Sequence, residues 1–216
     1  MGLNADLNAL MQENIKQIAP ETVNILMSGI KEVIDSGIAG RALKPGAAAP
    51  AINLPNATGD RIDVSAMLTD GPVVVSFYRG AWCPYCNLEL AALKSRLPEI
   101  EELGARLVAI TPETPDNSLT VKQKHGLEFE VLSDQGNEVA RQFGLVFRVD
   151  DATNEALLGF GIDVEASNGN ASQELPLPAT YVVASDGSIA GAFVDADYTK
   201  RMEPDDIIAT LKGLAG

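Results

Sequence analysis

The residues with the clearest chemical potential are Cys83 and Cys86, in the stretch "VVVSFYRGAWCPYCNLEL" (residues 73–90), and the chain of 216 residues has no other cysteine. The run "VVVSF" predicts a strand buried on both faces. A helix over residues 84–103 is predicted to follow, with Cys83 as its N-cap and Pro84 in its first turn. Because first-turn N–H groups are unpaired and the helix dipole is positive there, this position lowers the pKa of a thiol.

The spacing of the two cysteines favours a redox site. Cys86 lies within the first turn, close enough to form a small disulfide with Cys83. Arg79 adds positive charge, and Trp82 is either a wall of the site or a capping aromatic. Two other interpretations stay open: inert packing, or half of a metal or iron–sulfur site shared between two chains. His125, the one histidine, and two cysteines cannot supply the usual four zinc ligands within one chain.

Composition excludes several classes of partner. The net charge is −14, and no cluster of Lys and Arg stands out, which argues against nucleic acid and anionic membranes. No apolar stretch approaches the ~20 residues of a membrane span. The N-terminus lacks the basic and apolar regions of a secretory signal. We therefore expect a cytoplasmic protein without a nucleic-acid or membrane partner.

The hydrophobic periodicity predicts an α/β architecture. Residues 3–38 read as a helical hairpin whose apolar stripes cover either the main domain or a second subunit, as in a homodimer. A linker at 42–50 and a short hairpin follow, and the helix at 84–103 is expected to be interrupted or bent near Pro98. The pattern weakens over residues 145–173, and residues 165–172 read as a turn-rich loop. The remaining elements are strands at 73–77, 105–110 and 129–134, helices at 115–126 and 136–144, a strand hairpin around Asp186 and Gly187, and a last helix at 203–214.

Three segments of the sequence resemble a known family. "WCPYC" resembles the active-site segment of thioredoxin-fold proteins, and "CPYC" is shared with glutaredoxins. Residues 105–145 look like the central segment of peroxiredoxins. "FYRGAWCPYC" and "DYTKRMEP" together resemble the peroxiredoxin-like branch of the alkyl hydroperoxide reductase/thiol-specific antioxidant family. The resemblance implies a thioredoxin-like domain over residues 45–216, with a mixed central sheet flanked by helices, and leaves residues 1–44 as a helical extension.

The sequence departs from the family pattern at the site itself. Peroxiredoxins usually carry Pro-X-X-X-Thr-X-X-Cys, so if Cys86 takes the peroxidatic position, Cys83 replaces the Thr and Arg79 the Pro. Pro178 stands where the family has an Arg, and it resembles the cis-proline that faces the cysteines in thioredoxin-type reductases. We therefore predict a cis Leu177–Pro178 bond, with Pro178 near the cysteines. Arg148 or Arg201 could replace the missing Arg, although a solvated surface charge is the favoured interpretation of each.

The resemblance implies a thiol-dependent peroxidase. A cysteine thiolate attacks a peroxide and becomes a sulfenic acid, the second cysteine closes a disulfide, and a thioredoxin-like or glutathione-like thiol reduces it. No cofactor or metal is expected. The alternatives are a thioredoxin-like disulfide reductase and a non-catalytic metal or iron–sulfur module built by two chains. The expected catalytic and supporting residues are Cys83 and Cys86, with Arg79, Trp82, Pro84, Tyr85 and Pro178.

The order of attack depends on which argument is followed. The helix-start position favours Cys83, since the N-cap lies closest to the unpaired N–H groups. Alignment with peroxiredoxins favours Cys86. The departures from the family pattern lead us to predict that Cys83 attacks first.

Overall fold

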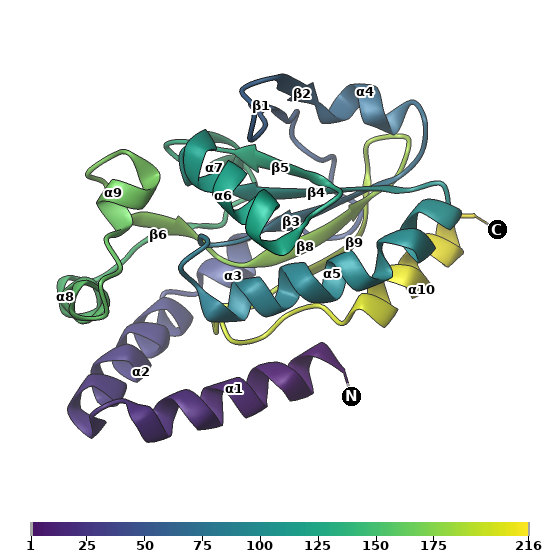
Figure 1. The fold of residues 1–216 in the computed structure, drawn as a ribbon. Coiled ribbons are helices and arrows are strands. Elements are labelled where there is room, and N and C mark those ends of the chain that lie inside the picture. The colour runs from purple at the N-terminus through teal and green to yellow at the C-terminus, as the bar shows by residue number, and fades with distance from the viewer. Residues whose placement is uncertain (1, 216) are drawn as a thin grey trace.

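A five-stranded mixed sheet is the framework of the computed structural model, which describes residues 2–215 (Figure 1). The strand order is β5-β4-β3-β8-β9. Strands β3, β4 and β5 are parallel, whereas β8 is antiparallel to β3 and β9 to β8. The mixed α/β sheet expected from the sequence is thereby confirmed. The strands are β3 (Val73–Phe77), β4 (Arg106–Thr111), β5 (Glu130–Ser133), β8 (Ala179–Val183) and β9 (Ile189–Val194).

Helices cover both faces of the sheet. On one face lie α5 (Pro84–Glu102) and α10 (Pro204–Leu214), which run side by side (Figure 1). On the other face lie α3 (Ile38–Arg41), the hairpin of β1 (Asn53–Pro55) and β2 (Arg61–Asp63), α4 (Val64–Leu68) and α7 (Glu138–Gln142). Helix α6 (Pro115–His125) packs beside β5 and ends at Gly126, which takes the left-handed conformation expected of a helix stop.

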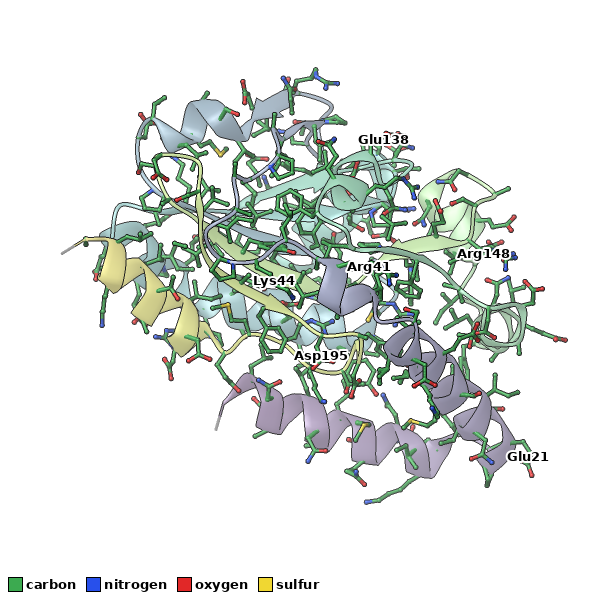
Figure 2. The ribbon with its side chains drawn as sticks, turned by 180° about the vertical axis from the view of Figure 1, so that it is seen from behind. Glu21, Arg41, Lys44, Glu138, Arg148 and Asp195 are labelled. Atoms are coloured by element: carbon green, nitrogen blue, oxygen red, sulfur yellow. The ribbon has the colours of Figure 1, made fainter. Side chains whose placement is uncertain are left out.

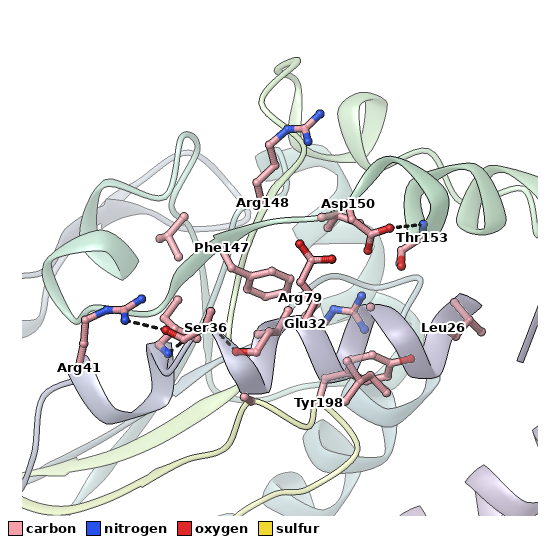
Figure 3. Close-up of a pocket in the computed structure, with 17 residues that line it drawn as sticks. Leu26, Glu32, Ser36, Arg41, Arg79, Phe147, Arg148, Asp150, Thr153 and Tyr198 are labelled. Carbon is pink, nitrogen blue, oxygen red and sulfur yellow. Dashed lines mark hydrogen bonds between the residues drawn. The ribbon is translucent and has the colours of Figure 1, made fainter. Parts of the chain in front are cut away.

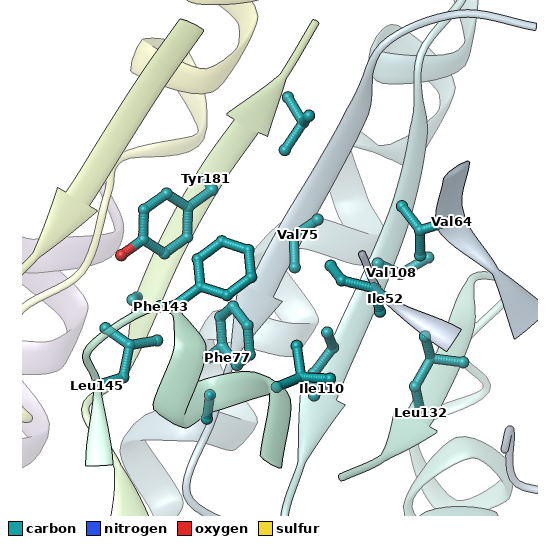
Figure 4. Close-up of a cluster of buried hydrophobic side chains, with 14 of the residues drawn as sticks. Ile52, Val64, Val75, Phe77, Val108, Ile110, Leu132, Phe143, Leu145 and Tyr181 are labelled. Atoms are coloured by element: carbon teal, nitrogen blue, oxygen red, sulfur yellow. The ribbon is translucent and has the colours of Figure 1, made fainter. Parts of the chain in front are cut away.

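Strand β3 is buried on both faces, as its continuous apolar run predicts. Because side chains alternate along a strand, Val75 and Phe77 enter one core and Val74 the other. In the first core Phe77, Phe143 and Tyr181 form a cluster of tilted and edge-on rings (Figure 4). The second core contains both cysteines. A rigid central strand therefore leads directly to the cysteine turn.

The N-terminal helical hairpin is confirmed as α1 (Leu3–Gln17) and α2 (Pro20–Asp35). Helix α1 packs along α5, and α2 packs along α8 (Asp151–Gly159) (Figure 1). The carboxylate of Glu203 accepts hydrogen bonds from the first backbone N–H groups of α1, including that of Asn4 at 2.8 Å. The Asn4 side chain also bonds both backbone groups of Arg201. The hairpin is thus fixed to the loop before α10. The division of the chain into an extension (residues 1–44) and a domain (residues 45–216) stays a prediction.

The segment of weak pattern, residues 145–173, contains regular structure, and the first part of the loop expected at 165–172 is helical. It forms β6 (Val146–Arg148), α8 and α9 (Val164–Asn168), and β6 pairs with β7 (Glu174–Pro176). Asp150 and Asp163 cap the two helices by accepting hydrogen bonds from backbone N–H groups. The elements are too short to show a period and are held by a small core of their own, consisting of Val149, Leu157, Val164 and Leu175.

The expected cis-proline is wrong. Residues 2–215 contain no cis peptide bond, so Leu177–Pro178 is trans. Only Leu177 and Pro178 separate β7 from β8, and the Leu177 N–H donates a hydrogen bond to the Leu145 carbonyl. The chain therefore passes from one strand to the next without the tight turn typical of cis-proline. Helix α5 runs through Pro98 as a single helix, so the expected interruption there is wrong, whereas a bend stays a prediction.

Candidate active site

The turn after β3 places Cys83 at the start of α5, as the sequence predicts. Cys83 is the N-cap, Pro84 is in the first turn, and the first helical bond runs from the Asn87 N–H to the Cys83 carbonyl. Gly80 allows this turn, because a Cβ there would lie only 2.4 Å from the Trp82 indole nitrogen. The indole therefore folds back over the turn.

Both thiols are free and almost fully buried. Burial by itself would raise the pKa of Cys83, but a hydrogen bond from Cys86 and the charges of Arg79 and Arg201 together lower it to about 6. Burial, together with the neighbouring Cys83 thiolate, holds the pKa of Cys86 well above its usual range. The pair therefore shares one negative charge near neutral pH, and Cys83 is the more acidic of its two thiols.

Arg201 lies in this site, so its interpretation as a solvated surface charge is wrong. Its side chain is 1% exposed, its Nη2 donates to Cys86 Sγ over 3.3 Å, and its Nε donates to Glu89. Arg148 lies elsewhere, on the surface, where it pairs with Asp151 (Figure 2). Of the two candidate arginines, the fold brings only Arg201 to the cysteines.

Glu89 completes a buried ion pair that the sequence reasoning missed. It lies one turn after Cys86, its carboxylate pairs with Arg201, and it accepts a hydrogen bond from Thr180 of β8 over 3.4 Å. Burial raises the pKa of Glu89 to about 7, although Arg201 opposes the shift. The available signal was an acidic residue within the buried stripe of α5, which otherwise carries Cys86, Leu90, Leu93 and Leu97.

Arg79 is the second buried cation of the site. Its guanidinium carbon lies 4.9 Å from the ring centre of Trp82 and 4.1 Å from that of Tyr198. Within residues 2–215 it has no carboxylate partner closer than 4.0 Å, and its Nε has no hydrogen-bond acceptor. The aromatic faces stabilise the cation without neutralising it, so its charge acts on the thiolate. Figure 3 shows Arg79 and Tyr198 lining a cavity of about 270 Å³ beside α2.

The remaining predicted residues surround this centre. Trp82 packs against Arg79, and half-buried Tyr85 contacts Tyr198 edge-on, with ring centres 5.7 Å apart. Pro178 is buried and precedes Ala179, which pairs with Phe77 at the end of β3. Pro178 therefore lies at the same sheet edge as the cysteine turn, and its contact with the cysteines stays a prediction.

Glu113 approaches the cysteine turn from the neighbouring strand. It follows β4, whose carboxyl end lies beside that of parallel β3, and its Oε2 accepts the Ala81 N–H over 2.8 Å. Burial raises the pKa of Glu113 to about 7. The hydrogen bond from the Ala81 N–H lowers this pKa, whereas the charge of Cys86 raises it further. The sequence reasoning missed this residue, although an acid after the adjacent parallel strand was a usable signal.

Glu113→Gln is expected to change the pH dependence of stability. The folded pKa of about 7 lies above the unfolded value of 4.5, so protonated Glu113 stabilises the fold fully below pH 4.5, and this contribution is lost as the pH rises through 7. Relative to the variant, the wild type should lose about 2 to 3 kcal/mol of unfolding free energy over this window. Denaturant titrations at a series of pH values measure the difference; parallel profiles would contradict it.

Within residues 2–215, no group of three or more His, Cys, Asp or Glu side chains is placed to hold a metal ion. Nor does any helix in that range have the length and apolar character needed to cross a bilayer.

Comparisons with known proteins relate the chain to one family. The model of the AhpC/TSA family matches residues 45–192. A Mycobacterium tuberculosis protein with peroxiredoxin in its name is 33% identical over 102 residues, which are 47% of this chain and 64% of that protein. Peroxiredoxin Bcp of Escherichia coli is 29% identical over 103 residues, or 48% and 65% of the two chains. The match thus spans less than two thirds of the length of these curated relatives.

A solved structure shares the fold. Peroxidoxin BcpB from Mycobacterium tuberculosis superposes with a TM-score of 0.63 at 23% identity, covering 80% of this chain and 98% of that one. The two folds therefore correspond over most of this chain and nearly all of the other.

Proposed function

Because the chain belongs to the AhpC/TSA family, we propose that it is a thiol-dependent peroxidase that uses Cys83 and Cys86. The observation that carries this proposal is the position of Cys83 at a helix start near two buried arginines, whose charges lower its pKa to about 6. At neutral pH such a thiol is largely thiolate, which is the nucleophilic form.

The proposed reaction starts with attack on the peroxide. The Cys83 thiolate bonds to the terminal oxygen of ROOH, the O–O bond breaks, and the other oxygen leaves as an alcohol after taking up a proton. Cys83 is then a sulfenic acid. Glu89 and Glu113, each with a pKa of about 7, are buried groups that can supply and accept protons here.

The second step closes the disulfide. The sulfur of Cys86 attacks the sulfur of the Cys83 sulfenic acid, the S–S bond forms, and the hydroxyl leaves as water with the proton of Cys86. Two electrons from an external thiol, thioredoxin-like or glutathione-like, then restore both cysteines. A homodimer formed through the N-terminal hairpin remains part of the proposal.

Disulfide exchange is the second candidate function. The observation favouring it is that both cysteines lie on one helix turn, with the low-pKa thiol at the N-cap and its partner fully buried. Such a pair can also attack a protein disulfide. The buried charge of Arg201 favours peroxide chemistry instead, since it also acts on Cys83 and stabilises negative charge at the cysteine pair.

The reaction of the reduced protein with three oxidants tests the proposal. We expect hydrogen peroxide and an organic hydroperoxide to react faster in stopped-flow measurements than a small disulfide does. Intact mass after one equivalent of peroxide should show the loss of two hydrogens within a single chain. Faster reaction with the disulfide would favour the second candidate, and a stable inter-chain disulfide as the main product would contradict the proposed pairing.

A further inference from the structure

A cavity of about 400 Å³, here called the apolar cavity, lies between α1, α2 and the C-terminal end of α8. Cys83 and Arg79 both line it, whereas Cys86 does not. Cys83 therefore borders a space whose volume falls in the size range of ligand sites. Its apolar walls include Met11, Ile15, Met27, Ile30, Leu157 and Phe160.

Several of these wall residues are exposed in a way that is unusual for large apolar side chains. Met27 is 49% exposed, Phe160 is 46% exposed and Ile15 is 39% exposed, and they come from three different segments. Scattered apolar residues need no explanation, but a group gathered at one cavity marks a binding site. The mouth of the apolar cavity therefore presents an apolar surface that leads inward to Cys83.

Most of the apolar wall lies outside the part of the chain that matches the family. The AhpC/TSA match begins at residue 45, whereas the hairpin of α1 and α2 ends at residue 35. Met11 and Ile15 come from α1, and Met27 and Ile30 come from α2. The helical hairpin therefore adds a surface over the thiol that the matched domain does not itself supply.

We propose that this hairpin is a specificity element that binds the organic body of a hydroperoxide substrate in the apolar cavity. The inference rests on the proposed peroxidase function. The hydroperoxide group lies at Cys83, and the carbon skeleton lies against Met27 and Ile15. After the O–O bond breaks, the alcohol leaves through the same mouth.

Size and chemistry favour an organic hydroperoxide over hydrogen peroxide as the occupant. A volume of roughly 10–15 Å³ on this measure suffices for one water molecule, so the cavity holds far more than two oxygen atoms. Hydrogen peroxide has no carbon and gains nothing from apolar walls. Each methylene buried on binding is worth about fourfold in kcat/KM, so the walls discriminate steeply in favour of a substrate that fills them.

The test compares two glutamate substitutions on the same helix. Met27→Glu places a charge in the wall of the apolar cavity, while Ile34→Glu makes the same change at a site that is equally exposed, 49%, but does not line the cavity. With cumene hydroperoxide, Met27→Glu should lower kcat/KM by at least about tenfold, because burying an unpaired charge beside an apolar group is unfavourable. Hydrogen peroxide should react with both variants within about twofold of wild type.

Ile15→Glu tests the opposite wall and should reproduce the selective loss. Equal losses with both peroxides, or no loss with cumene hydroperoxide, would overturn the inference. The inference would also be overturned if the variants kept wild-type rates with both peroxides but changed from dimer to monomer in sedimentation. A second copy of the chain would then be the occupant of the apolar cavity. Wild-type protein that reacts with neither peroxide would instead refute the proposed function, which keeps the two failures apart.

Discussion

Cys83→Ser should lose the reaction with peroxide, by at least about a thousandfold, whereas Cys86→Ser should retain one rapid turnover. The reason is that Cys83 is the N-cap, has the lowered pKa and lines the apolar cavity, while Cys86 is buried beneath it. Without Cys86 no internal disulfide forms, so Cys83 should stop as a sulfenic acid that a sulfenic-acid reagent traps. Stopped-flow rates and intact mass measure the two outcomes.

The choice of serine at position 86 matters for this experiment. A serine hydroxyl can replace the Cys86 thiol as a hydrogen-bond donor to the Cys83 thiolate, so Cys86→Ser should keep the Cys83 pKa low. Cys86→Ala removes the donor, and the pKa of Cys83 should rise. Alkylation rates measured against pH report both values.

The opposite ordering has a structural basis too, because Arg201 Nη2 contacts the sulfur of Cys86. If the protein that keeps only Cys86 shows the lower thiol pKa and the faster peroxide reaction, Cys83 is the resolving residue. Alignment with the peroxiredoxin pattern would then give the correct order, and the helix-start position would be secondary.

Arg201→Met should be the most destabilising single substitution at the site. Glu89 is 1% exposed, and its ion pair with Arg201 is completely buried, so removing the cation leaves an uncompensated buried carboxylate. Breaking such a pair costs about 3 to 5 kcal/mol of unfolding free energy. The same substitution removes a positive charge that lowers the pKa of Cys83, so that pKa should rise and the peroxide rate at neutral pH should fall.

Two further variants separate the structural effect from the chemical one. Arg201→Met combined with Glu89→Gln should recover most of the stability, since no buried charge is left unpaired, but should not restore the low pKa of Cys83. Arg148→Met is the control: its ion pair with Asp151 is exposed, so the expected cost is below about 1 kcal/mol, without any change in thiol pKa. Denaturant unfolding and thiolate titration measure both quantities. A double variant that recovers the thiol pKa as well would show that Arg201 acts only through the fold.

Local signals in the sequence determined the core of the fold and the reactive turn. The apolar run of β3 marked a strand buried on both faces, and Cys83 followed by Pro84 marked a helix start. Gly126 marked the end of α6, and Asp186 with Gly187 marked the turn between β8 and β9. Each of these features is decided by residues within a few positions, because backbone conformation, capping and turn geometry are short-range effects.

Only the tertiary structure decided what surrounds the thiols. Arg201 is 115 residues from Cys86 in the chain, and no local pattern distinguishes it from Arg148, so its burial depends on where the loop before α10 lies. Glu113 reaches the site only because β4 pairs with β3. The expected cis-proline failed for the same reason, since the path from β7 into β8 fixes the Leu177–Pro178 bond. Charge burial depends on elements distant in sequence, so the local pattern located the thiols but could not identify the charged groups that set their pKa values.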